Sequence, residues 1–153
     1  MRYVHTLQTS ILPAQQNSIA QWIDDFLNGE GGNAALASGL KRERREYFGP
    51  ISLSIEAVGR CCGPEAGMRY PVSQEDFDRR VEGIKKAIAT GLSLPPLIIN
   101  FSDDKLTLSD GNHRYQALKE LGFNTIDTIV WTTGAQDMKK FMAEYENRFQ
   151  RIF

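Results

Sequence analysis

The stretch Ser109-Asp110-Gly111-Asn112-His113-Arg114-Tyr115-Gln116-Ala117-Leu118 decides the fold of this chain. It follows an apolar, strand-like segment and opens an amphipathic, helix-like one. A strand that enters a helix through a glycine turn directs free backbone N–H groups at whatever lies in front of the helix. A carboxylate, an imidazole and a guanidinium stand beside this turn. The pattern therefore predicts an anion site, and phosphate is the anion that fits it best.

Each residue of the turn has a predicted role. Gly111 permits the tight turn and a close approach of the anion to the backbone, and Asn112 lies in the first helical turn. His113 titrates near neutrality, so it can donate to phosphate oxygens or move a proton, and Arg114 offers a planar fork for a phosphate. Asp110 can cap the helix, hold a divalent cation or accept a proton from a substrate hydroxyl. The plainer alternative is a simple Asp-Gly turn whose His and Arg face water.

Composition restricts the class of protein. The 153 residues suffice for one domain with a real core, and 41% hydrophobic with 24% charged residues is typical of globular proteins. Lys and Arg number 18 and Asp and Glu 19, so the formal net charge is -1. That balance argues against a protein that coats DNA by bulk charge. No apolar run is long enough for a membrane span, and residues 1–12 lack a signal-peptide core.

The segment before the first predicted strand is expected to be mostly helical. Residues 1–13 are predicted to form an extended arm that ends at a proline. A helix follows over residues 18–27, in which Ser18 and Gln21 fit a capping box. A shorter helix is expected over residues 34–40.

A basic run at residues 41–46 carries four positive charges against two negative ones. Two interpretations stay open for this run. It contacts nucleic acid or another anion, or it is a solvated helix face on which the interleaved Glu residues balance the cations.

The rest of the chain alternates predicted strands and helices, defined by apolar periodicity, capping residues and glycine stops. These elements are a strand over 51–56, a helix that Ser73 caps and Gly91 ends, a hairpin of strands over 97–101 and 106–108, a helix that stops at Gly122, a strand over 126–131, and a last helix with Met138, Phe141, Met142, Tyr145, Phe149 and Ile152 on one face.

Residues 59–67 form a glycine-rich loop that contains the adjacent Cys61 and Cys62. Neighbouring cysteines rarely pair, because the ring that they close is strained, so we expect free thiols, a reducing compartment and a cytoplasmic protein. A metal or thiol-redox role is the alternative to small, partly buried side chains. With only His5 and His113 as further nitrogen ligands, a zinc site would also need carboxylates, and no bound metal is predicted here.

Pro95-Pro96, a strand, a turn, a second strand and the run from Asp110 to Ala117 together resemble the ParB/sulfiredoxin superfamily. The resemblance covers residues 51–131 and is clearest over 73–122. The superfamily includes ParB-type partition proteins, sulfiredoxins and ADP-dependent free-serine kinases. It implies an α/β (α+β) fold with a small mixed sheet and flanking helices.

The same resemblance implies the domain organisation and the ligand-binding residues. Residues 1–50 would be an N-terminal helical extension, and residues 51–153 a ParB/sulfiredoxin-like domain that ends in a helix. The residues that match the phosphate-binding turn, with the further basic contact on the preceding helix, are Gly111, Asn112, His113, Arg114, and Arg79 or Arg80.

Three departures from the superfamily patterns bear on the reaction. Sulfiredoxin-like sequences have their reactive cysteine immediately before His-Arg, where this chain has Asn112, and an amide is not a nucleophile, so the protein is not a sulfiredoxin. ParB-type proteins read Glu-Arg-Arg near this point and continue into a helix-turn-helix domain, whereas about twenty residues follow Trp131 here. Serine-kinase-like members read Asp-Gly-His-His-Arg, which would place Asp110 near the accepting hydroxyl or a magnesium ion.

Three functions follow as hypotheses. The first is a phosphotransferase or nucleotide hydrolase that uses Mg²⁺ with ATP, ADP or CTP and in which Asp110 and His113 are catalytic. The second is a ParB-like DNA-binding or nuclease domain, for which residues 41–46 are the support. The third is a module that senses a nucleotide or a phosphorylated small molecule without turnover. The sequence does not separate them, and it predicts no oligomeric state.

Overall fold

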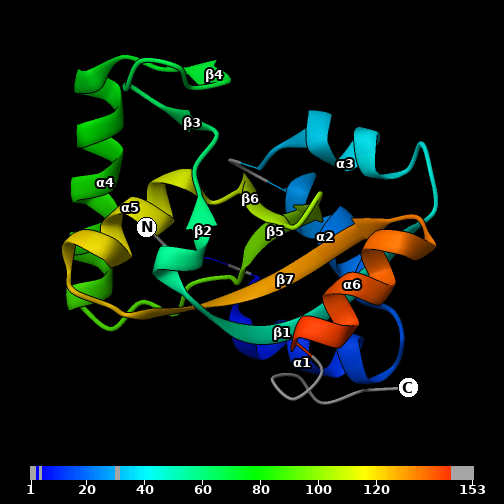
Figure 1. Cartoon of the computed structure of the whole chain (residues 1–153). Coiled ribbons are helices and arrows are strands. Elements are labelled where there is room, and N and C mark those ends of the chain that lie inside the picture. The colour runs from blue at the N-terminus through cyan, green and yellow to red at the C-terminus, as the bar shows by residue number, and fades with distance from the viewer. Residues whose placement is uncertain (1–2, 4, 30–31, 146–153) are drawn as a thin grey trace.

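The computed structural model describes residues 3, 5–29 and 32–145 of the chain. A five-stranded sheet of order β1-β7-β5-β6-β2 forms the middle of the molecule (Figure 1). Its strands are β1 (Arg45–Ser54), β2 (Val58–Gly59), β5 (Leu97–Ser102), β6 (Lys105–Asp110) and β7 (Thr125–Thr133). A separate two-stranded sheet pairs β3 (Cys62–Gly63) with β4 (Tyr70–Pro71). The α-helices of the described residues are α1 (Leu7–Gln15), α2 (Ile19–Leu27), α3 (Ala34–Leu40), α4 (Gln74–Ala89), α5 (Asn112–Glu120) and α6 (Ala135–Tyr145).

Strand β5 is the centre of the sheet. It pairs parallel with β7 and antiparallel with β6, and the β5–β6 hairpin confirms the prediction for this segment. Leu97 and Ile99 belong to the core on one face, whereas Ile98 belongs to the core on the other face. A strand buried on both faces is a continuous apolar run, and this is why the run at residues 97–101 was recognisable in the sequence.

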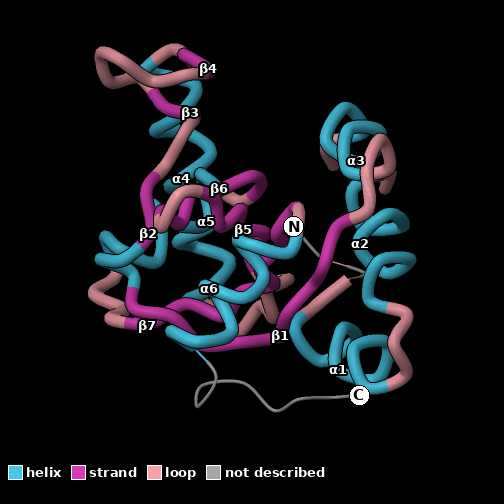
Figure 2. The backbone as a smooth tube through the Cα atoms, turned by 45° about the vertical axis from the view of Figure 1, so that its right-hand side comes forward, coloured by secondary structure: helices cyan, strands magenta, loops and turns pink. Residues whose placement is uncertain are grey.

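Helices cover both faces of the sheet, which gives the α/β class expected from the sequence. Helices α5 and α6 supply Tyr115 and Phe141 to the core on one face, and α2 and α3 supply Trp22 and Leu40 on the other. Helix α4 packs against the outside of α5 through Phe77 and the residues that share its apolar stripe. Figure 2 shows α1, α2 and α3 on the side of the molecule opposite α4 and α5. In the described part of the chain, no helix combines the length and the apolar character that a bilayer crossing needs.

The extended arm predicted for residues 1–13 is wrong for most of its length, because a helix begins at Leu7. Thr6 and Thr9 form a reciprocal capping box that starts α1, and Pro13 lies inside the helix near its end. The predicted capping box of α2 is also absent, since the hydroxyl of Ser18 donates to the carbonyl of Pro13 instead. Residues 1, 2 and 4 lie outside the described part.

Two boundaries differ from the prediction in the middle of the chain. The basic run at 41–46 is not a helix face, because β1 already begins at Arg45, well before the predicted strand start at residue 51. The strand predicted for 51–56 ends at Ser54, and the chain continues as a single 3₁₀ turn.

The hydroxyl of Ser73 accepts a hydrogen bond from the backbone N–H of Asp76 and starts α4, as predicted. In the last helix, Phe149 and Ile152 lie outside the described residues.

Candidate functional site at the start of helix α5

The turn between β6 and α5 requires glycine. Strand β6 ends at Asp110, Gly111 has a φ of 104°, and α5 begins at the next residue. A Cβ atom at this position would lie 3.0 Å from Nη2 of Arg114 and 3.0 Å from Cγ of Leu97. Only glycine combines this backbone conformation with such close neighbours. The sharp strand-to-helix turn expected from the sequence is confirmed, and it leaves the first N–H groups of α5 without intrahelical partners.

The guanidinium of Arg114 is not free to bind a ligand, contrary to the prediction from the sequence. The residue is only 5% exposed, and its Nη1 donates to the carbonyl oxygens of Pro95 at 2.7 Å and Pro96 at 3.2 Å. Its Nη2 forms an ion pair with Oδ2 of Asp110 at 2.9 Å. The guanidinium thus ties the end of β6 and the start of α5 to the segment that enters β5. Arg114 positions the turn, and Asp110 already has a cationic partner.

The N-terminal segment covers this ion pair. The ring centroid of Phe26 on α2 lies 5.6 Å from the guanidinium carbon of Arg114. Burial raises the pKa of Tyr3, while the charge of Arg114 lowers it and that of Asp110 raises it. The residues before β1 therefore help to build the site as well as the core.

Asn112 holds the cysteine loop. Asn112 is buried, with only 7% of the residue exposed. Its Oδ1 accepts hydrogen bonds from the backbone N–H groups of Cys61 at 3.1 Å and Cys62 at 3.2 Å. The Sγ of Cys61 donates to the carbonyl of Leu108 at 3.0 Å, and both thiols are free. Burial raises the pKa of Cys62, which favours the protonated thiol. The loop is consequently anchored on the first residue of α5.

His113 lies in the first turn of α5 among cations. Its half-buried ring is 5.1 Å from the ring of Phe77 on α4. Burial lowers the pKa of His113 most, the charges of Arg80 and Arg60 lower it further, and Asp110 opposes them. The imidazole is therefore held in its neutral form, next to an excess of positive charge.

The two arginines that the sequence left as alternatives have different surroundings. Arg79 is exposed and pairs with Asp76 at 2.9 Å on its own helix. The charge of Arg80, in contrast, lowers the pKa of both His113 and Cys62.

Arg60 is a site residue that sequence reasoning missed. Its side chain is 9% exposed, its guanidinium carbon lies 4.8 Å from the ring centroid of Phe77, and it forms an ion pair with Glu65. Its Nη1 also donates to the carbonyl of Cys62 at 3.1 Å. No local pattern marks this residue, because the ring that it covers is seventeen positions away in the chain.

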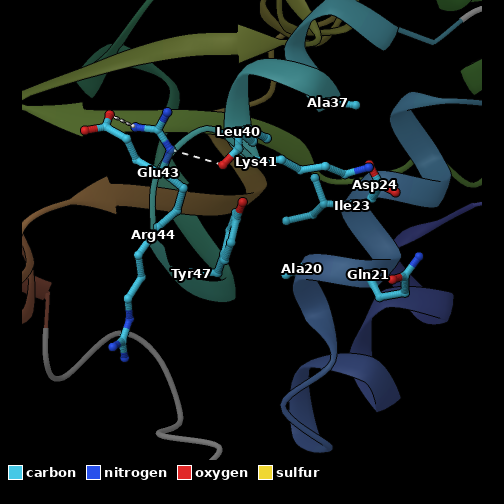
Figure 3. Close-up of a pocket in the computed structure, with 11 residues that line it drawn as sticks. Ala20, Gln21, Ile23, Asp24, Ala37, Leu40, Lys41, Glu43, Arg44 and Tyr47 are labelled. Carbon is cyan, nitrogen blue, oxygen red and sulfur yellow. Dashed lines mark hydrogen bonds and ion pairs between the residues drawn. The ribbon is translucent and has the colours of Figure 1, made fainter.

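A cavity of about 410 Å³ lies elsewhere, between α2, α3 and β1 (Figure 3). Its apolar walls include Ile23 and Leu40, and Figure 3 shows Lys41 extended toward Asp24, with which it forms a 2.8 Å ion pair. Burial raises the pKa of Tyr47, which also lines the cavity. No residue of the Asp110–Arg114 turn lines it, so this cavity and the turn are different places.

The basic run is largely neutralised by ion pairs. Lys41 pairs with Asp24, Arg44 pairs with Glu46 at 3.2 Å, and Arg45 pairs with Glu43 at 3.3 Å. These contacts weaken the interpretation of residues 41–46 as a nucleic-acid contact. Across the residues that the structure describes, no group of three or more His, Cys, Asp or Glu side chains is arranged to hold a metal ion.

Comparisons with known proteins give structural neighbours only, since no family model and no curated protein matches the chain. Sulfiredoxin from Arabidopsis thaliana is 20% identical over 61% of this chain and 94% of its own, with a TM-score of 0.40. A Pnob8-like ParB N-domain is 18% identical over 67% of this chain and 37% of its own, with a TM-score of 0.39. A free serine kinase in complex with AMP is 13% identical over 57% of this chain and 32% of its own, with a TM-score of 0.38.

These neighbours are of the three kinds named by the sequence resemblance, and the TM-scores are 0.40 or lower. The chain spans about a third of the length of the ParB and free serine kinase chains that it matches. The properties of the site therefore follow from its own side chains.

Proposed function

We propose that this protein binds the phosphate groups of a nucleotide, or of another phosphorylated small molecule, at the start of α5. The observation that carries the proposal is the position of His113 in the first turn of α5, where its ring lies 5.1 Å from that of Phe77 and the guanidinium carbon of Arg60 lies 4.8 Å from the same Phe77 ring. The charges of Arg60 and Arg80 both lower the pKa of His113. Two nearby carboxylates are already paired, Asp110 with Arg114 and Glu65 with Arg60, so the charge of Arg80 is added to two ion pairs. Unpartnered N–H groups, the positive end of a helix dipole and excess cationic charge together attract an anion.

The residues have distinct roles in this proposal. The backbone N–H groups of Asn112 and His113 donate to phosphate oxygens, and the side chains of His113 and Arg80 add charge-assisted contacts. Gly111 lets the anion approach the backbone. Arg114 acts indirectly, by fixing the turn from which these groups project.

Isothermal titration calorimetry with ADP, ATP and CTP, with and without Mg²⁺, tests the proposal. Arg80→Ala should weaken binding about tenfold, because a hydrogen bond to a charged group contributes about 1.5–3 kcal/mol. Arg79→Ala is the matched control, because it removes the same charge from the neighbouring residue, whose guanidinium is paired with Asp76. It should change the affinity less than twofold. No heat at millimolar nucleotide, or equal losses in the two variants, contradicts phosphate binding at this site.

Turnover is a separate proposal. A phosphotransferase or nucleotide hydrolase would use Asp110 as base or Mg²⁺ ligand through the oxygen that Arg114 leaves free, and His113 would move a proton. Phosphate release and transfer to small hydroxyl acceptors are measured for the wild type and for Asp110→Asn. Binding without any turnover identifies a nucleotide-sensing module instead. The two free thiols fit a reducing compartment, and we propose the cytoplasm.

A further inference from the structure

Tyr70 is an aromatic side chain left largely in water. It is 55% exposed, more than any other large hydrophobic residue of the described part except Leu12. The guanidinium carbon of the preceding residue, Arg69, lies 5.4 Å from the centroid of its ring. A flat ring with a guanidinium beside it, both accessible, offers the surface on which a nucleic base stacks.

This aromatic residue is tied by hydrogen bonds to the start of α5. The N–H of Tyr70 donates to the carbonyl of Cys61 at 2.9 Å, and the N–H of Cys61 donates to Oδ1 of Asn112 at 3.1 Å. A further backbone bond from Val72 to Gly63, at 3.1 Å, fixes β4 against β3. Figures 1 and 2 both show β3 and β4 beyond β2 and β6, at the end of the molecule where α4 begins. Two hydrogen bonds through Cys61 therefore link the backbone of Tyr70 to the side chain of Asn112 in the first turn of α5.

Resting on the proposed function, we propose that Tyr70 and Arg69 stack on the base of a nucleotide whose phosphates bind at the start of α5. Stacking needs only the π face that every base has, so the site takes nucleotides with little preference between purines and pyrimidines. Phosphorylated compounds without an aromatic ring bind through the α5 contacts alone. The ligand class is thus a nucleoside phosphate rather than a sugar phosphate or an inorganic phosphate.

The experiment compares phosphorylated ligands that have a base with phosphorylated ligands that lack one. Calorimetry on the full chain gives the affinities of ADP, CTP, ribose 5-phosphate and pyrophosphate for the wild type and for Tyr70→Ala, Tyr70→Phe and Arg69→Ala. Stacking is expected to make ADP bind about tenfold more tightly than pyrophosphate, which has the same number of phosphates and no base. Tyr70→Ala should remove that advantage and leave pyrophosphate affinity unchanged, whereas Tyr70→Phe should keep it. Arg69→Ala should lose part of it.

A matched control comes from Phe123, an aromatic residue 47% exposed beyond the C-terminal end of α5. Phe123→Ala should leave every affinity within twofold of the wild type. If pyrophosphate binds and Tyr70→Ala costs the nucleotides nothing, stacking on Tyr70 is overturned while phosphate binding at α5 stands. If neither pyrophosphate nor any nucleotide binds, the proposed function fails and the stacking proposal fails with it.

Discussion

Asn112→Ala is the substitution whose effect follows most directly from the structure. The side-chain oxygen of Asn112 is the acceptor for two backbone N–H groups, those of Cys61 and Cys62, at 3.1 and 3.2 Å. Alanine removes that oxygen and leaves the first turn of α5 otherwise intact. The cysteine loop then loses its anchor on the helix, and two half-buried donors lose their partner.

The expected magnitude comes from these two bonds. An N–H group that loses its acceptor costs about 1–3 kcal/mol, and the lower end applies here because both cysteines are partly exposed and water can reach them. Two donors therefore cost about 2 kcal/mol. Alanine is a better helix former than asparagine by about 0.5 kcal/mol, which offsets part of the loss. The free energy of unfolding should fall by about 1.5 kcal/mol.

Urea unfolding and amide hydrogen exchange measure this effect at two levels. With a slope of about 2 kcal/mol per molar urea, the unfolding midpoint should drop by about 0.75 M. Exchange at Cys61 and Cys62 should accelerate at least tenfold, whereas exchange in the central strand β5 should change only as much as global stability does. Asn112→Asp is the matched control, because it keeps the acceptor and places a negative charge at a helix N-terminus, where it is favourable by about 0.3–1 kcal/mol.

Two results would refute the reasoning. One is an Asn112→Ala protein within about 0.5 kcal/mol of the wild type with unchanged exchange at the two cysteines, since an exposed Asn that makes no such bonds behaves in this way. The other is an Asp variant as unstable as the Ala variant, because the acceptor would then not be what matters.

Three further outcomes are expected from the same structure. Gly111→Ala should lower the free energy of unfolding, measured in urea, by about 2 kcal/mol. The φ of 104° at this position strains an L residue, and the alanine Cβ would lie 3.0 Å from two side chains. A loss below about 0.5 kcal/mol contradicts this expectation. Tyr115→Phe should cost about 1–2 kcal/mol in the same assay, since the hydroxyl shares its one proton between two buried carbonyl oxygens at 2.8 and 2.9 Å, and an unchanged midpoint would count against this bond. The pKa of His113 is lowered in the folded protein, so its neutral form contributes stability that is present above the unfolded value of 6.5 and is lost as pH falls below it. His113→Gln should flatten this pH dependence of the urea midpoint. NMR titration of the two imidazoles should find that the pKa of His113 is below 6.5 and that bound phosphate raises it, with the other histidine as internal control. A His113 pKa above 6.5 in the free protein contradicts the arrangement of cations described here. A His113 pKa that phosphate does not change contradicts it as well.

The elements that the sequence predicted well are those whose signals are local. The hairpin around residues 97–108, the start of α4 at Ser73 and the turn at Gly111 each depend on neighbours in the chain: a continuous apolar run, a capping hydroxyl and a glycine before a helical stripe. The helix over residues 7–15 was missed because proline argued for an extended arm, whereas the capping box at Thr6 and packing on α2 outweigh one lost hydrogen bond.

The roles of the site residues needed long-range information. Arg114 is predicted to be an exposed fork, yet its acceptors are carbonyl groups 18 and 19 residues earlier in the chain, brought to it by the β5–β6 hairpin. Asn112 meets the cysteine loop across 51 residues, and Arg60 reaches the site by packing on Phe77 of α4. Arg79 and Arg80 are adjacent, yet Arg79 pairs with Asp76 on its own helix, whereas the charge of Arg80 lowers the pKa of His113.

By itself, the sequence determined that a strand turns sharply into a helix at Gly111 and that this turn carries a basic pair, because backbone conformation at a glycine and helical periodicity are local properties. Only the tertiary structure decided that the guanidinium of Arg114 is buried and holds the turn, whereas the imidazole of His113 stays neutral and partly exposed. A buried cation is satisfied by whatever acceptors the fold places around it, and those acceptors come from distant parts of the chain.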